Sequence, residues 1–138
     1  MSTRLKEKEE KILEIIEKLK EQSKKGTPII VEGKKDIETL TVLGVEGKIL
    51  TAKTGGKSFL DVVSEIEKSN TKEVILLLDF DRRGKEGTKR IKRSLEQARI
   101  KPNMKFWREL SSLLGKDVKD IESLTSYMET LKSKISNS

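Results

Sequence analysis

The apolar run at residues 74–78 constrains the fold most, because it ends abruptly in Asp79-Phe80-Asp81. Its apolar residues do not alternate with polar ones, which is typical of a strand in a parallel sheet covered by helices on both faces. Ligands bind beyond the carboxyl ends of such strands, so Asp79 and Asp81 lie where a site is expected. While the chain stays extended their side chains point the same way. Paired carboxylates suit Mg²⁺ or Mn²⁺, whereas a turn or helix cap is the structural alternative.

A second apolar, β-branched run at residues 28–31 also ends in an acid, because Glu32-Gly33 follows it directly. If the two strands are neighbours, Glu32 lies beside the aspartates. Three carboxylates in one crevice repel one another unless a metal ion or a proton intervenes. Asp36, four residues further on, has two interpretations: a cap for a helix beginning near residue 37, or another acid of the metal site.

Strands alternate with helices along the rest of the chain, which favours right-handed crossovers and a parallel sheet between helical layers. We therefore predict an α/β, Rossmann-like fold of three layers with about four parallel strands flanked by helices. The predicted strands cover residues 28–31, 48–52, 74–78 and 104–110, with Pro102 at the bend before the last. The predicted helices between them cover residues 37–43, 58–68 and 86–99.

The predicted organisation has three parts around one core. An amphipathic helix occupies residues 1–25, and its apolar stripe packs on the sheet or, alternatively, on a protein partner or a second copy. The α/β domain covers residues 26–110. Residues 111–138 form a helical extension packed on the same domain, with a helix at 121–135 and a disordered tail.

Together, Glu32-Gly33 after one strand, Asp79-x-Asp81 after a later strand and Gly84 beyond it resemble the Toprim domain. This domain is shared by topoisomerases, bacterial-type primases, the maturase of 5S ribosomal RNA and several nucleases. The resemblance covers residues 27–110 and implies a Toprim fold. It also implies that Glu32 is the general acid or base of phosphodiester chemistry, and that Asp79 and Asp81 hold a divalent ion.

Positive charge is concentrated directly after the Asp-x-Asp motif. Residues 82–108 hold eleven basic side chains against two acidic ones, part of a net charge of +7 for the 138-residue chain. Such a segment beside a metal site suits a polyanion, although a solvated helix face is the alternative. The candidate nucleic-acid contacts are Lys34, Lys35, Lys53, Lys57, Arg82, Arg83, Lys85, Lys89, Arg90 and Arg93.

Several functional classes can be excluded or set aside. The chain has no Cys or His, which excludes zinc ribbons, thiol nucleophiles and His-dependent nucleases. Gly56-Lys57-Ser58 resembles the end of a P-loop, but Thr51 replaces its first glycine, so Lys53 and Lys57 suit at most a backbone phosphate. Tyr127 lies in an amphipathic helix, where an aromatic residue usually packs. Phe106 and Trp107 either stack on a base or fill the core.

These observations predict a Mg²⁺- or Mn²⁺-dependent Toprim nuclease that hydrolyses phosphodiester bonds in RNA or DNA. A nucleic-acid-binding or regulatory module with little catalysis is the alternative, and primase-like nucleotidyl transfer is a weaker one. No apolar stretch has the length of a bilayer span and no secretion signal is evident, so we expect a cytoplasmic protein without membrane contact.

Overall fold

The fold is built on a parallel sheet whose strands run in the order β2-β1-β3-β4, in a computed structural model that describes residues 3–52 and 59–137. Each neighbouring pair of strands is parallel, and Val31 of β1 is in register with Thr51 and with Leu77. The strands are β1 (Ile29–Val31), β2 (Ile49–Thr51), β3 (Glu73–Leu77) and β4 (Lys101–Asn103). The helices of the described residues are α1 (Thr3–Lys24), α2 (Lys34–Val42), α3 (Phe59–Lys68), α4 (Arg82–Gln97), α5 (Lys105–Leu114) and α6 (Leu124–Ser136).

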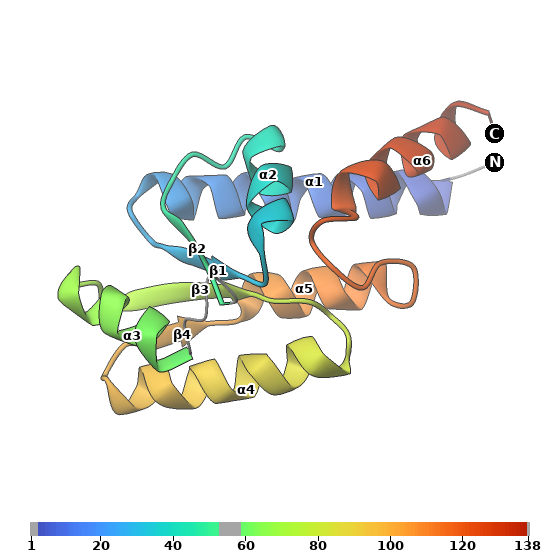
Figure 1. The fold of residues 1–138 in the computed structure, drawn as a ribbon. Helices are drawn as coiled ribbons and strands as arrows, with labels where there is room; N and C mark the ends of the chain where they lie inside the picture. The colour runs from blue at the N-terminus through green and yellow to red at the C-terminus, as the bar shows by residue number, and fades with distance from the viewer. Residues whose placement is uncertain (1–2, 53–58, 138) are drawn as a thin grey trace.

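Both faces of the sheet are covered, because successive strand side chains point to opposite sides. On one face Ile29 and Ile75 pack with apolar residues of α1, α2, α5 and α6. On the other face Ile30 and Leu76 pack with residues of α3 and α4. Figure 1 shows α1 and α2 above the sheet and α4 below it. The predicted three-layer α/β fold with parallel strands is confirmed.

The predicted strand at residues 104–110 is wrong, because this segment lies in α5 and the fourth strand comes earlier. Phe106, Leu110 and Leu114 are buried at a spacing of four, which is the period of a helix. Pro102 lies within β4 instead of before the strand. Its missing N–H is tolerated there because β4 is at the edge of the sheet.

Helix boundaries differ from the predictions by a few residues. Helix α4 begins at Arg82, directly after the Asp-x-Asp motif, and it ends before Arg99, which has a positive φ of 61°. Helix α6 begins at Leu124 and continues to Ser136, so the first residue of the predicted disordered tail is helical.

The apolar stripe of α1 packs within this chain. Ile12, Ile15, Ile16 and Leu19 are buried in the same core as residues of α5 and α6, which supports packing on the domain over dimerisation through the stripe. The N-terminal and C-terminal helices therefore cover the same face of the sheet. None of the helices in residues 3–52 and 59–137 is long and apolar enough to span a bilayer.

Candidate active site

The two acidic strand ends meet at the centre of the sheet. Strands β1 and β3 are neighbours, and Val31 is in register with Leu77, so Glu32 and Asp79 leave the sheet at the same edge. The connection after β1 leads to α2 on one face, and the connection after β3 leads to α4 on the other. A crevice between such diverging connections is the usual ligand site of an open parallel sheet.

A cavity of about 360 Å³ occupies this position. It brings Glu32 and Asp79 together with the start of α2, as the sequence predicts. Two further acids, Asp120 and Glu122, come from the segment between α5 and α6 and were not among the predicted site residues. The lining residues are Glu32, Gly33, Lys34, Lys35, Asp36, Asp79, Asp120 and Glu122.

Among the acids of this crevice, Asp79 is the one whose charged form is disfavoured most by its surroundings. Its Oδ1 atom is buried and has no hydrogen-bond partner among the described residues. Burial, which is the largest cause, and the negative charges of Glu32, Asp36, Asp120 and Asp81 together raise the pKa of Asp79 to about 7. A carboxylate in this state gains stability from either a proton or a cation. It is the clearest sign that a ligand belongs here.

Asp81 is near Asp79 but is not among the residues that line the cavity, because the chain turns into α4 at this residue. It is the N-cap of α4, and its Oδ1 atom accepts a hydrogen bond of 2.8 Å from the Gly84 N–H. The expectation that both side chains point the same way required an extended chain, whereas β3 ends at Leu77. A carboxylate that caps a helix with one oxygen can still offer the other to a cation.

Asp36 joins two parts of the crevice that are far apart in sequence. Its Oδ2 atom accepts a hydrogen bond of 2.9 Å from Gly33 N–H, and its Oδ1 atom accepts one of 2.8 Å from Glu122 N–H. Gly33 is the N-cap of α2, and Asp36 lies three residues later. Burial raises the pKa of Asp36, while the two N–H donors oppose this shift. Its position and bonding favour the capping interpretation over a role as a metal ligand.

The acids suit a divalent ion by their chemistry. Hard carboxylate oxygens are the ligands that Mg²⁺ and Mn²⁺ prefer, and Asp79 offers a buried oxygen without a partner. Within the described part of the chain, no group of three or more acidic side chains is arranged to hold an ion. Mg²⁺ does not require such a group, because it usually keeps several waters and binds through one or two carboxylates plus substrate phosphates. The residues therefore fit Mg²⁺ held by Asp79 with Glu32 or Asp81.

The predicted basic contacts divide into two groups. Lys34 and Lys35 lie at the start of α2 beside the crevice, where Lys35 Nζ is 3.8 Å from Glu122 Oε1. The other group lies on α4 and is exposed to solvent: Arg82, Arg83, Lys85, Lys89, Arg90 and Arg93. Arg82 pairs loosely with Glu86 on the helix surface, at 3.5 Å. Lys53 and Lys57 lie outside the described residues.

The aromatic residues considered for base stacking, Phe106 and Trp107, pack against the protein. Phe106 is buried in the core. Trp107 donates a hydrogen bond of 2.9 Å from Nε1 to the Leu78 carbonyl, and its ring centroid is 6.1 Å from that of Phe80. Trp107 thus fixes α5 to the chain just before Asp79, which favours a structural role over base stacking. The Tyr127 hydroxyl lies 3.4 Å from Asp117 Oδ2.

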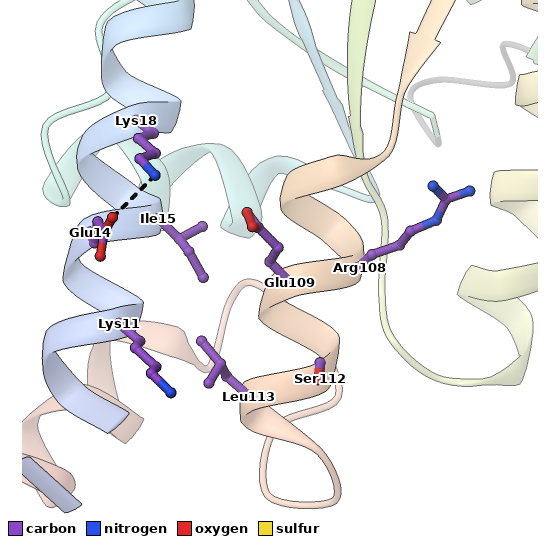
Figure 2. A pocket seen from close by; sticks show the side chains of 8 residues that line it. All are labelled: Lys11, Glu14, Ile15, Lys18, Arg108, Glu109, Ser112 and Leu113. Atoms are coloured by element: carbon purple, nitrogen blue, oxygen red, sulfur yellow. Dashed lines mark ion pairs between the residues drawn. The ribbon is translucent and has the colours of Figure 1, made fainter. Parts of the chain in front are cut away.

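A second cavity, of about 390 Å³, lies between α1 and α5 (Figure 2). Ile15 and Leu113 give it an apolar part, while its charged residues are of both signs, and Lys18 pairs with Glu14 at 3.1 Å. Mixed and internally paired charges do not favour a polyanion. We therefore place the candidate site in the acidic crevice. The residues lining the second cavity are Lys11, Glu14, Ile15, Lys18, Arg108, Glu109, Ser112 and Leu113.

Comparison with known proteins identifies the family. The Toprim domain matches residues 27–108, which include Glu32, Asp79, Asp81 and Gly84. Toprim domains generally bind Mg²⁺, and the match supports a function related to nucleic acids in general. Asp120 and Glu122 lie beyond the matched residues.

Archaeal relatives have similar size. A UPF0292 protein of Methanocaldococcus jannaschii is 45% identical over 86% of this chain and 91% of its own length. A UPF0292 protein of Pyrococcus furiosus is 40% identical over 89% of this chain and 88% of its own length. A protein of known structure from Aquifex aeolicus covers 80% of this chain and 94% of its own, with a TM-score of 0.68 and 28% identity. The chain therefore belongs to the Toprim domain family and, within it, to the small UPF0292 proteins.

Proposed function

We propose that this protein is a Mg²⁺- or Mn²⁺-dependent nuclease that hydrolyses phosphodiester bonds in RNA or DNA. The observation that carries the proposal is the Asp79 carboxylate, whose buried Oδ1 has no hydrogen-bond partner in residues 3–52 and 59–137 and which shares its crevice with Glu32. Both residues lie at the carboxyl ends of neighbouring strands. A charge kept at such a position without compensation indicates a ligand that binds during function.

The roles of the acids follow from their positions. Asp79 and Asp81 would hold the metal ion, with Glu32 completing the site or moving a proton between the attacking water and the leaving oxygen. When bound, the ion would supply positive charge to the scissile phosphate and orient the water. Hydrolysis adds water across one P–O bond and leaves a phosphate on one product and a hydroxyl on the other. Glu32 is half-buried and lines the crevice with Asp79, which places its carboxylate next to the candidate ion site.

The exposed basic surface of α4 supports nucleic acid as the substrate. The helix begins at the active-site motif, and its side chains Lys89, Arg90 and Arg93 are exposed. Basic side chains of this kind bind the phosphate backbone and do not distinguish the bases. We therefore expect the protein to prefer nucleic acids of a particular shape and to show little preference for sequence.

The test is incubation of the purified protein with end-labelled single- and double-stranded RNA and DNA in Mg²⁺, Mn²⁺ or chelator. We expect metal-dependent products from the parent and at least a 100-fold lower rate from Asp79→Asn/Asp81→Asn, because charge stabilisation by a metal is worth several kcal/mol. Circular dichroism must show that the variant is folded. Equal cleavage by the folded variant would refute the mechanism.

A binding module with little catalysis is the second candidate. It is favoured by one observation: in the described part of the chain, no three acidic side chains are arranged to hold an ion. This candidate predicts that intact nucleic acid is retarded on a gel under every metal condition while no products form. Incorporation of labelled nucleotides in the same reactions would indicate primase-like transfer instead.

Charge reversal on α4 should weaken binding under either candidate. We expect Arg90→Glu/Arg93→Glu to lower the affinity for nucleic acid by at least tenfold at about 100 mM salt, and to reduce the salt slope by about 2. Fluorescence anisotropy with a labelled oligonucleotide measures both.

Lys24→Glu/Lys25→Glu is the matched control for that charge reversal. It makes the same charge change on exposed residues that precede β1, at the end of the sheet opposite to the crevice. Equal losses in the two double variants would mean that net charge, and not the surface of α4, determines binding.

A further inference from the structure

The segment at residues 117–123 lies beyond the Toprim match, yet it forms one wall of the acidic crevice. Its apolar residues hold it firmly: Val118 is 2% exposed and Ile121 is fully buried. Phe80 N–H, within the Asp79-Phe80-Asp81 motif, donates a hydrogen bond of 2.6 Å to the Lys119 carbonyl. The segment is thus attached directly to the motif that carries the candidate metal ligands.

A second attachment fixes the same segment to the β1 side of the crevice. The Asp36 carboxylate accepts hydrogen bonds from both Gly33 N–H and Glu122 N–H, and Asp36 is only 5% exposed. Removing such a two-bond link would leave two partly buried N–H donors without this acceptor. Residues 119–122 are therefore held by one bond to Phe80, which follows β3, and by another to Asp36 in α2, which follows β1.

Within this segment Asp120 has the side chain that requires a functional explanation. It is half-buried, and it lines the crevice together with Glu32 and Asp79. Its Oδ1 atom accepts a hydrogen bond of 2.8 Å from Ser123 N–H. That bond needs only an acceptor, which Asn or Ser provides without charge. The negative charge therefore adds repulsion to the crevice and nothing to the local turn.

Glu122 is a weaker candidate for the same role. Its carboxylate lies 3.8 Å from Lys35 Nζ, and half of its side chain is exposed. Glu122 is thus partly neutralised within the protein, whereas Asp120 lines the crevice with the other acids. The charge of Asp120 is best explained by a cation that occupies the crevice together with Asp79.

We propose that Asp120, supplied by the segment that follows the Toprim domain, is a further cation-binding residue of the crevice. The inference rests on the proposed function, because it assigns Asp120 to the same divalent ion. Asp120 contributes either directly or through a metal-bound water. Segment 117–123 is then part of the site, so the Toprim domain alone does not complete the site.

The experiment measures Mn²⁺ binding in the full-length protein by electron paramagnetic resonance, without nucleic acid. Asp120→Asn removes the charge and keeps an acceptor for Ser123 N–H, and Asp120→Ser is a second neutral replacement. Asp79→Asn is the variant expected to lose binding. Glu46→Gln is the matched control, because Glu46 is exposed and precedes β2, at the opposite end of the sheet.

We expect the parent and Glu46→Gln to bind Mn²⁺ alike, and both Asp120 variants to bind at least fivefold more weakly. If Asp79→Asn loses binding while both Asp120 variants bind like the parent, the inference is overturned and the metal site stands. If the parent binds no Mn²⁺, the metal site and the inference are both overturned. If Mn²⁺ binding depends on Asp120 but no substrate is cleaved, the inference stands and the nuclease proposal fails.

Discussion

Asp79→Asn should make the protein more stable at pH 8 while it abolishes metal-dependent cleavage. The pKa of Asp79 is raised from 3.8 to about 7 in the folded state, mainly by burial. Below pH 4 the carboxyl is protonated in both states, so the substitution should change little. As the pH rises from 4 to 7, the unfolded chain releases this proton while the folded protein retains it. The folded state therefore loses stability over this range.

The size of the expected stability gain follows from the pKa shift of Asp79 and from the partial exposure of this residue to solvent. The neutral amide removes this loss, so we expect Asp79→Asn to gain about 2 kcal/mol at pH 8, after a discount for partial solvent screening. At pH 5 the gain should be much smaller. Urea denaturation at the two pH values measures the difference.

Metal addition gives this prediction an internal control. Mg²⁺ should raise the unfolding temperature of the parent at pH 8 and have little effect on Asp79→Asn, because the ion binds only to the folded, charged site. Equal stabilisation by the substitution at pH 5 and pH 8 would show that charge is not its cause. The combination of lost activity and gained stability would identify Asp79 as a residue kept for function.

Gly84→Ala should cause the largest loss of stability among the substitutions considered for this site. A Cβ atom at Gly84 would overlap the backbone carbonyl of Asp79 and lie 2.9 Å from its Cα. Backbone cannot rotate away as a flexible side chain can, and β3 and the bond between Phe80 and Lys119 hold this stretch in place. We expect a loss of about 2–3 kcal/mol and a displaced Asp79, with reduced Mn²⁺ binding.

Gly33→Ala provides the matched comparison for stability. Nothing lies within 4 Å of a Cβ built at Gly33, and its φ of −149° is extended backbone that any residue adopts. We expect a loss of at most about 0.5–1 kcal/mol, from the weaker N-cap. The urea midpoints of Gly84→Ala and Gly33→Ala, measured under the same conditions, give the two losses of stability. Similar losses would mean that close approach of the backbone at Gly84 is not what requires glycine.

Local patterns were sufficient to predict the central strands and the acids at their ends. Each of these strands has its pattern in a few consecutive residues: an unbroken apolar run before Asp79 and a short β-branched run before Glu32. In a parallel sheet the carboxyl ends of both strands then lie at one edge. The register of Val31 with Leu77 confirms that the two strands are neighbours.

Local patterns gave a wrong prediction where a short apolar segment is compatible with both a strand and a helix. Residues 104–110 were predicted as a strand, but Phe106 and Leu110 lie on the buried side of α5. Three or four apolar residues in such a segment do not distinguish a strand from a helix, and packing against α1 and β3 decides the outcome. Asp81 shows the same limit, because the chain turns from β3 into α4 at this residue, so that its side chain caps the helix.

By itself, the sequence determined the fold class, the acidic strand ends and the concentration of positive charge after Asp81, because periodicity and charge are properties of neighbouring residues. Only the tertiary structure brought Asp120 and Glu122 into the crevice and gave Asp36 its bond to Glu122 N–H. The bond between Asp36 and Glu122 joins residues 86 positions apart in the chain. No local pattern encodes such a distance, because it depends on how α5 and α6 pack over the sheet.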